Sequence, residues 1–389
     1  MRRLAVASLV VILAAGCAEE TPSGSTGTAS TGDIVIGAVL DITGAGATLG
    51  GPEKQTLELL AEQANAAGGV NGRKIKLIIE DNQSTEDGAA KATTKLISQD
   101  KADIILGASR TGPSLAMGGI VESGKIPMIS LAANAKIVQG RSWVFKTAQN
   151  DSVVLQNIVD YAAAKGWKKL GLVRDASGFG EGVAEMLNEL GKAQGVSVVR
   201  TEKFAPDATE FTAQMVNIRD AGADANLIWG IPPAAGLAQK SYRQLGIKAP
   251  VMQSHGVGNQ AFLDTAADSA NGVVLPLGRL VIADQLPADD PQKQVLTTFQ
   301  KDFTAKYGQG PSTFAGHAYD AFKLAVDAFA KVGTDKQKVR DHLEQVKGFV
   351  GVSGTFTMTP QDHSGLGKDA LAIVTVENAG WKLQDVNRD

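Results

Sequence analysis

The feature that most constrains the fold is an alternation, from residue 33 onward, of short apolar runs with longer amphipathic ones. Residues 33–40 are apolar and rich in β-branched side chains, and a glycine-rich loop follows, as is typical of a buried parallel strand. Strands are expected next at 76–81, 102–107 and 127–131, alternating with helices at 52–67, 86–99 and 114–123. This rhythm predicts an α/β fold with helices on both faces of a parallel sheet.

The same rhythm starts again near Asp151, which predicts a second doubly wound unit. A helix is expected at about 153–165, and strands at 169–173, 196–200, 226–229 and 250–252. The C-terminal third is less regular, with helices near 291–307, 314–332 and 336–346 and strands at 272–277 and 370–376. We therefore expect two lobes joined by a multi-stranded hinge: lobe 1 from 33–150 with about 278–355, and lobe 2 from 151–277 with about 356–389.

The first 32 residues differ in character from the rest. Residues 1–16 begin with basic residues, continue as an apolar run too short to span a bilayer and end in small residues, as a secretory signal peptide does. Cys17, the only cysteine of the chain, follows directly and resembles the lipidated cysteine of a bacterial lipobox, although Ala14 replaces the usual Leu. Residues 17–32, rich in Ser, Thr and Gly, predict a disordered tether. We expect a lipid-anchored protein outside the cytoplasmic membrane; the alternative is a chance Cys in an ordinary signal peptide.

Composition and motifs argue against several function classes. A formal net charge of −3 gives no reason to expect a nucleic-acid partner. The four His residues lie in no H-E-x-x-H pattern or Cys/His cluster, so no metal site is expected. There is no G-x-S-x-G elbow and no cysteine nucleophile in the fold, so we expect neither an enzyme nor a cofactor. A hydrolase and a ligand-sensing domain remain the alternatives from other classes.

The loop at residues 44–50 follows a strand and precedes a helix, as a dinucleotide-binding loop does. Its spacing is one residue too long for G-x-G-x-x-G, and Asp81 lies about ten residues too far on to bind a ribose. We predict instead that the glycines let a ligand approach the backbone.

The most informative stretch is 106–114, which reads as a strand, a polar loop and a helix start. Pro113 marks the first turn, with Thr111 or Gly112 near the N-cap, so free N–H groups face the carboxyl edge of the sheet. Such a helix start is suited to a carboxylate, although Thr111 could simply cap its helix. Arg110 either pairs with an anion or is a solvated loop residue. Asn134 follows the next strand at the same edge, where it either contacts a ligand or serves only in a turn.

Several short segments, in this order and spacing, resemble the type I periplasmic binding proteins of branched-chain amino-acid transport over residues 33–386. They are Ile36-Gly37-Ala38 with the 44–50 loop, Asn65-Ala66-Ala67-Gly68-Gly69-Val70-Asn71-Gly72, Asp81-Asn82-Gln83-Ser84, Phe179-Gly180-Glu181-Gly182 and His317-Ala318-Tyr319-Asp320-Ala321. The resemblance implies a monomeric binding protein that closes over a small-molecule ligand between its lobes and delivers it to the permease of an ABC transporter.

The resemblance also implies which residues bind the ligand. Thr111 matches the hydroxyl residue that holds the ligand carboxylate, and Ala132 and Asn134 match further polar contacts in lobe 1. The wall positions correspond to Leu49, Phe179 and Ile231.

One departure from the family pattern concerns the ligand's ammonium group. His255 stands where amino-acid binders carry an acidic residue, and a neutral His cannot replace that carboxylate. We therefore predict an aromatic or other apolar carboxylate as the ligand; a branched-chain amino acid or an amide is the alternative. His255 could also be only a core or hinge residue.

Overall fold

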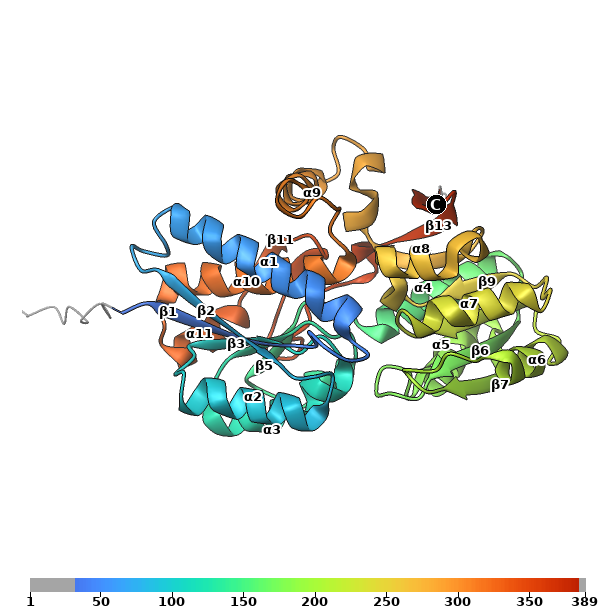
Figure 1. Cartoon of the computed structure of the whole chain (residues 1–389), viewed down its shortest axis with the longest axis horizontal. Helices are drawn as coiled ribbons and strands as arrows, with labels where there is room; N and C mark the ends of the chain where they lie inside the picture. The colour runs from blue at the N-terminus through green and yellow to red at the C-terminus, as the bar shows by residue number, and fades with distance from the viewer. Residues whose placement is uncertain (1–31, 385–389) are drawn as a thin grey trace, which may run out of the picture. The chain divides into compact units, whose positions relative to one another are not determined.

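The computed structural model describes residues 32–384 (Figure 1). The expected signal peptide, Cys17 and nearly all of the expected tether lie outside these residues. No helix within 32–384 has both the length and the apolar character needed to cross a membrane.

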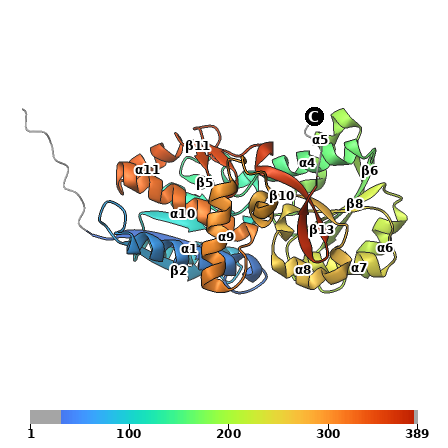
Figure 2. The same ribbon diagram turned by 90° about the horizontal axis from the view of Figure 1, so that it is seen from above.

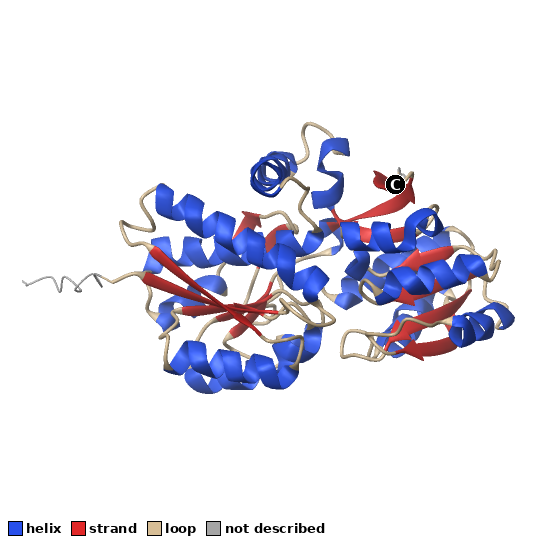
Figure 3. Ribbon diagram, viewed as in Figure 1, coloured by secondary structure: helices blue, strands red, loops and turns tan. Residues whose placement is uncertain are grey.

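The first lobe is built on a five-stranded parallel sheet with the order β2-β1-β3-β4-β5. Its strands are β1 (Ile34–Leu40), β2 (Ile75–Asp81), β3 (Ile104–Gly107), β4 (Met128–Ser130) and β5 (Val144–Lys146). Helices α1 (Ala47–Ala66) and α10 (Thr313–Val332) pack on one face, while α2 (Glu86–Ser98) and α3 (Thr111–Gly124) pack on the other (Figures 1 and 3). The expected doubly wound arrangement is therefore confirmed for this lobe.

The second lobe contains a seven-stranded sheet with the order β14-β13-β10-β9-β8-β6-β7. Five strands are parallel, β6 (Lys169–Asp175), β7 (Ser197–Phe204), β8 (Ala225–Trp229), β9 (Val251–Gln253) and β10 (Val274–Gly278). The other two, β13 (Leu371–Glu377) and β14 (Gly380–Leu383), are antiparallel. Helices α4 (Asp151–Ala164) and α5 (Val183–Gly191) share one core with the sheet. Helices α6 (Thr212–Asp220), α7 (Ala234–Gln244) and α8 (Gln260–Ala266) share the other.

The chain passes between the two sheets three times, after β5, after β10 and before β13 (Figure 2). The second passage leads through α9 (Lys293–Tyr307) to α10 and α11 (Lys336–Leu343), and the third follows the hairpin of β11 (Lys347–Val350) and β12 (Thr355–Thr357). Short 3-10 turns complete the fold, η1 (Ala135–Ile137), η2 (Lys192–Gln194), η3 (His255–Val257), η4 (Ala267–Ala270), η5 (Arg279–Gln285) and η6 (Lys368–Ala370).

One segment packs differently from the expected lobe boundaries. Residues 356–370 were assigned to lobe 2, but Phe356, Met358 and Leu366 are buried in the core of the first sheet with α10. Helix α9 packs against helices of lobe 1: the Tyr307 hydroxyl donates to the carbonyl of Gln55 on α1 at 2.7 Å, and the ring of Phe299 lies 4.6 Å from that of Tyr319 on α10. Apolar side chains select the core for residues 356–370, and periodicity along the chain does not reveal which core that is.

Candidate ligand-binding cleft

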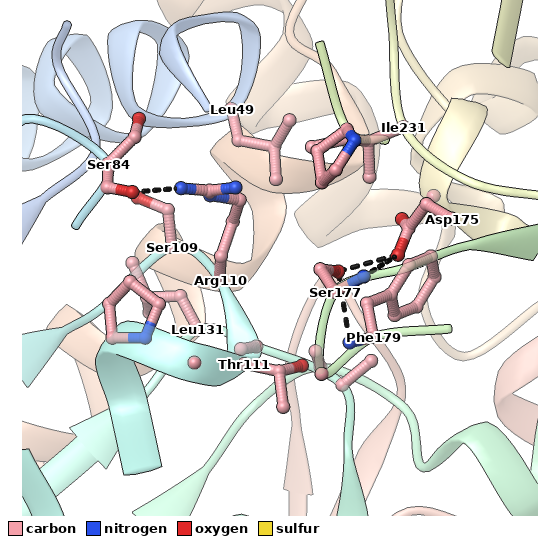
Figure 4. A pocket seen from close by; sticks show the side chains of 18 of the residues that line it. Leu49, Ser84, Ser109, Arg110, Thr111, Leu131, Asp175, Ser177, Phe179 and Ile231 are labelled. Carbon is pink, nitrogen blue, oxygen red and sulfur yellow. Dashed lines mark hydrogen bonds between the residues drawn. The ribbon is translucent and has the colours of Figure 1, made fainter. Parts of the chain in front are cut away.

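A cavity of about 300 Å³ lies at the carboxyl ends of the strands, between residues of the first and the second lobe (Figure 4). Its volume is at the lower end of the range for small-molecule sites. Its wall combines apolar side chains with a smaller number of polar ones. In chain order the wall residues are Leu49, Ser84, Glu86, Ser109, Arg110, Thr111, Gly112, Pro113, Leu131, Ala132, Ala133, Ala148, Asp175, Ala176, Ser177, Gly178, Phe179, Pro206, Ile231, His255, Gly256, Phe314 and His317.

The start of α3 forms the first-lobe side of the cavity. The turn into this helix requires Gly107, because its φ of +119° is left-handed and a Cβ would collide with the carbonyl of Val39. The helix begins at Thr111, and its first bond of the helical type runs from the N–H of Ser114 to the carbonyl of Arg110 at 3.1 Å. The N–H groups of Thr111 and Gly112 therefore have no carbonyl one turn earlier, and both residues line the cavity. Together they can hold a carboxylate.

Arg110 is fixed beside this helix start by an ion pair. Its Nε donates to Asp41 Oδ2 at 2.5 Å, and its terminal nitrogen donates to the carbonyl of Ser84. Asp41 is fully buried and also accepts from Asn82 Nδ2 at 2.7 Å. Arg110 is therefore an ordered residue of the cavity wall rather than a solvated one, and its charge is largely balanced by Asp41.

A second buried carboxyl group lies behind this network. Glu53, at the start of α1, is fully buried and bonds to the hydroxyl of Ser109, which in turn accepts from the N–H of Asp41 at 3.0 Å. Burial raises the pKa of Glu53 well above its ordinary value, and the nearby Asp41 charge raises it further. The raised pKa of Glu53 reduces the repulsion between the two buried acids, because it favours the uncharged form of Glu53.

The second-lobe side of the cavity is largely aromatic and apolar. Phe179 stacks on Trp229 with ring centroids 5.1 Å apart, and Trp229 Nε1 donates to the carbonyl of Phe179 at 3.0 Å. The turn before Phe179 is held by Asp175, whose Oδ1 accepts from the N–H of Ser177 at 2.9 Å and from its hydroxyl at 2.6 Å. Burial raises the pKa of Asp175. This carboxyl group lines the cavity, and the sequence analysis did not identify it.

Two neutral histidines also line the cavity. His255 packs edge-on against Phe179 and Trp229, with ring centroids 5.7 Å from each. Burial lowers its pKa to about 3, and the nearby His317 and Lys146 act in the same direction. His317, on α10, has its pKa lowered to about 3 by burial and by Lys146, and its Nδ1 lies 3.0 Å from the hydroxyl of Ser353.

Two buried ionisable residues lie next to these rings, where the chain first passes between the sheets. The Nζ of Lys146 donates to the carbonyl of Ala133 at 2.6 Å and to Asn150 Oδ1 at 2.8 Å. Asp151, the first residue of α4, is buried and its Oδ1 lies 4.0 Å from His255 Nε2. Burial raises the pKa of Asp151 and lowers that of Lys146, and each charge moderates the shift of the other.

Of the eight residues predicted to contact a ligand, the structure brings seven together in the cavity wall. These are Leu49, Arg110, Thr111, Ala132, Phe179, Ile231 and His255. Asn134 is not among the wall residues: its Nδ2 donates to the carbonyl of Gly178 at 3.2 Å, and its Oδ1 accepts from the N–H of Lys136 at 2.9 Å. Both of its polar groups are therefore used within the protein.

Two other expectations can be compared with the structure. Thr111 is the first residue of α3, directly after the N-cap Arg110, so it lies near the N-cap as predicted and does not itself cap the helix. The glycines of the 44–50 loop pack against the protein itself: a Cβ on Gly46 or Gly50 would collide with Asp41. Of this loop only Leu49 reaches the cavity wall.

Some wall residues were missed because they lie far apart in the sequence. Ser84, Phe314 and His317 belong to motifs or helices that were recognised, but only packing brings them to the cavity. No group of His, Cys, Asp and Glu within residues 32–384 is arranged to hold a metal ion.

Comparison with known proteins agrees with this architecture. A family model described as periplasmic binding protein matches residues 33–380. An amino acid binding protein of Pseudomonas aeruginosa is 29% identical over 320 residues, which cover 80% of this chain and 82% of that protein.

Solved structures agree as well. An extracellular ligand-binding receptor from Rhodopseudomonas palustris is 27% identical with a TM-score of 0.85, covering 90% of this chain and 99% of the receptor. A branched-chain amino acid transporter substrate binding protein from Streptococcus pneumoniae, solved with isoleucine, is 25% identical with a TM-score of 0.79, at the same coverage.

Proposed function

Since this chain belongs to the type I periplasmic binding proteins of the branched-chain amino-acid family, which are solute-binding proteins of ABC transporters, we propose that it captures a small apolar carboxylate by hinge closure. The observation that carries this proposal is the start of α3 in the cavity wall. There the N–H groups of Thr111 and Gly112 can receive a carboxylate, while Phe179, Ile231 and Leu49 surround an apolar body.

The absence of an α-ammonium group from the ligand is supported by the chemistry of His255. This ring replaces the acidic residue of amino-acid binders, and burial together with Lys146 keeps it neutral at physiological pH. An ammonium group placed against it would lose its hydration without gaining an opposite charge from the ring, which costs several kcal/mol. An aromatic or branched aliphatic monocarboxylate is therefore the favoured ligand.

A branched-chain amino acid is the second candidate, because an acidic side chain does line the cavity. Asp175 is buried there, and its Oδ1 is bonded to Ser177. Its carboxylate offers a partner for an ammonium group. The amino acid binding protein of Pseudomonas aeruginosa, among the relatives compared, is consistent with this candidate.

Lipid anchoring through Cys17 and delivery of the ligand to a permease complete the proposal. The anchor would hold the protein outside the cytoplasmic membrane, and residues 17–32 would link Cys17 to the folded lobes. Mass spectrometry of the protein from membranes of a bacterial host tests the anchor: we expect diacylglyceryl at Cys17, and Cys17→Ser to release the protein. An unmodified Cys17 contradicts the anchor.

A thermal-shift screen over aromatic acids, aliphatic acids, amino acids and amides tests the ligand class, followed by calorimetric titration of each hit. We expect monocarboxylates to raise the melting temperature and their primary amides not to do so. Recovery of the ligand unchanged after incubation with one equivalent of protein separates binding from catalysis. Stabilisation by branched-chain amino acids alone would replace the first candidate by the second.

A further inference from the structure

A fully buried lysine lies where the chain first passes between the sheets. Lys146 ends β5, and burial of its charge costs free energy that burial of an apolar side chain would not cost. Its Nζ donates to the carbonyl of Ala133 at 2.6 Å and to Asn150 Oδ1 at 2.8 Å. Ala133 belongs to the cavity wall, and Asn150 directly precedes α4 of the second lobe. A single side chain therefore connects the cavity wall in one lobe to the start of the other lobe.

The side chain of Asn150 serves this connection instead of its own helix. Asn150 is the N-cap of α4, where an Asn side chain usually accepts a hydrogen bond from the first turn, but here it makes no such bond. Its Oδ1 accepts instead from Lys146 and, at 3.2 Å, from the hydroxyl of Ser364. Ser364 precedes the third passage between the sheets. Asn150 is therefore bonded to residues at the first-lobe ends of two of the three passages.

The first-lobe side of this connection is fixed independently of α4. The N–H of Lys146 donates to the carbonyl of His363 at 3.1 Å, and the His363 ring stacks on Phe145 with ring centroids 4.2 Å apart. Burial lowers the pKa of Lys146, and the nearby charge of Asp151 counteracts that shift. Among the residues that bond to Lys146, only Asn150 belongs to the second lobe. A rotation of the second lobe that displaces the start of α4 therefore acts on the bonds of Asn150.

We propose that Lys146 is a positioning residue for closure: it fixes the start of α4 relative to the cavity wall and so favours the arrangement in which both lobes line the cavity. Lys146 is not itself a wall residue, so it acts through Ala133 and Asn150. Displacing the start of α4 breaks the bonds that Asn150 accepts from Lys146 and Ser364, and the open arrangement loses their free energy. This inference rests on the hinge closure of the proposed function and adds a residue that controls it.

Distance measurements between spin labels on the two lobes test this role without any ligand. In a Cys17→Ser chain, Lys91→Cys on α2 and Lys192→Cys on η2 supply the only two thiols, and the native side chains there are 76% and 71% exposed. We expect the chain with native Lys146 to populate the label distance of the arrangement described here. Lys146→Met should lower the ratio of this population to longer distances about 10-fold, because buried hydrogen bonds are lost. Lys146→Arg, which keeps the charge and the donors, should stay closer to the native ratio.

Two further variants separate this role from general destabilisation. Leu60→Ala leaves a cavity in the first-lobe core on α1, so it should lower stability and leave the distance ratio unchanged. Ser364→Ala removes the other bond to Asn150 and should lower the ratio about 3-fold, which decides the question if Lys146→Met does not fold. A native distance distribution in folded Lys146→Met or in Ser364→Ala would overturn the proposal, as would an equal shift in Leu60→Ala or a native chain that lacks the expected population. Since no ligand is present, none of these results bears on the ligand class of the proposed function.

Discussion

At the scale of single residues, the site depends on side chains held in fixed positions by buried partners. Arg110 is held by Asp41 and by the carbonyl of Ser84, and Phe179 is held by Trp229. Such partners remove side-chain freedom before the ligand arrives, which lowers the entropic cost of binding. Thr111 differs, because we propose that its hydroxyl bonds to the ligand itself.

Replacing Thr111 by Ala should weaken binding of the carboxylate by about 1–3 kcal/mol, because a buried hydrogen bond to a charged group is lost. Calorimetric titration measures the change. Thr94→Ala is a matched control, since Thr94 is an exposed residue of α2 whose hydroxyl bonds only to its own helix. Wild-type affinity in Thr111→Ala would remove Thr111 from the site.

The buried histidines should make stability depend on acid pH. His317 stays neutral in the folded protein down to about pH 3, whereas in the unfolded chain it takes up a proton near its ordinary value of 6.5. The contribution of His317 to the free energy of unfolding is therefore fully present above pH 6.5. It decreases as the pH falls toward 3, by up to about 1.4 kcal/mol per pH unit for this one group.

Urea unfolding at several pH values below 6.5 checks this expectation. His317→Gln should lose less stability per pH unit than the wild type, whatever its stability at neutral pH. The same slope in both proteins would show that His317 is accessible to protons when folded.

At the scale of elements, the start of α3 is the part that recognises charge. Its first N–H groups are free because a helix cannot satisfy them internally, and the end of β3 aims them at the cavity. The same helix start should therefore respond to an added negative charge in two opposite ways, because a charge there stabilises the helix and repels an anionic ligand.

Gly112→Asp should weaken carboxylate binding about 10-fold or more through like-charge repulsion. Its Cβ would lie 2.6 Å from Glu86 Oε1, so the Glu86 side chain must move to admit it. Gly119→Asp is the control, because Gly119 lies within α3 and has open space around it. Equal affinity loss in both variants would mean that general destabilisation, not charge at the helix start, is responsible.

At the scale of the whole molecule, binding must favour contact between the lobes. The two lobes are joined by three chain passages, and hydrogen bonds cross between them beside the cavity. Among these, Thr48 donates to the carbonyl of Pro232 at 3.1 Å, and Asn134 donates to the carbonyl of Gly178 at 3.2 Å. Under the proposed hinge closure, a ligand that contacts both lobes would act together with these bonds to stabilise the closed form.

Asn134→Ser should weaken ligand binding several-fold although Asn134 does not line the cavity. Ser can still cap η1, but it is too short to replace the bond to Gly178. We expect faster dissociation with little change in association, measured by stopped-flow fluorescence. Asn157→Ala, which alters only a bond within α4, should leave both rates unchanged. A slower association rate instead would point to a role in the open form.

The amino-acid pattern was sufficient for the α/β class and for the doubly wound arrangement, because the periods of strands and helices can be read along the chain. Of the eight residues predicted to contact a ligand, seven line the cavity, but most of these assignments came from the family resemblance rather than from those periods. Strand β5, with three residues, left no such pattern, whereas β4 and β9, of the same length, did.

Tertiary packing decided what depends on neighbours distant in sequence. It bonded Asn134 to Gly178, placed residues 356–370 in the first-lobe core, and brought Asp151 Oδ1 within 4.0 Å of His255 Nε2. Each of these outcomes is a choice between partners of similar chemistry, and only the three-dimensional fit of the cores selects one. The hydrogen-bond partners and the charges of the site are therefore set by the folded structure. The α/β architecture that carries the site, in contrast, follows from the order of residues along the chain.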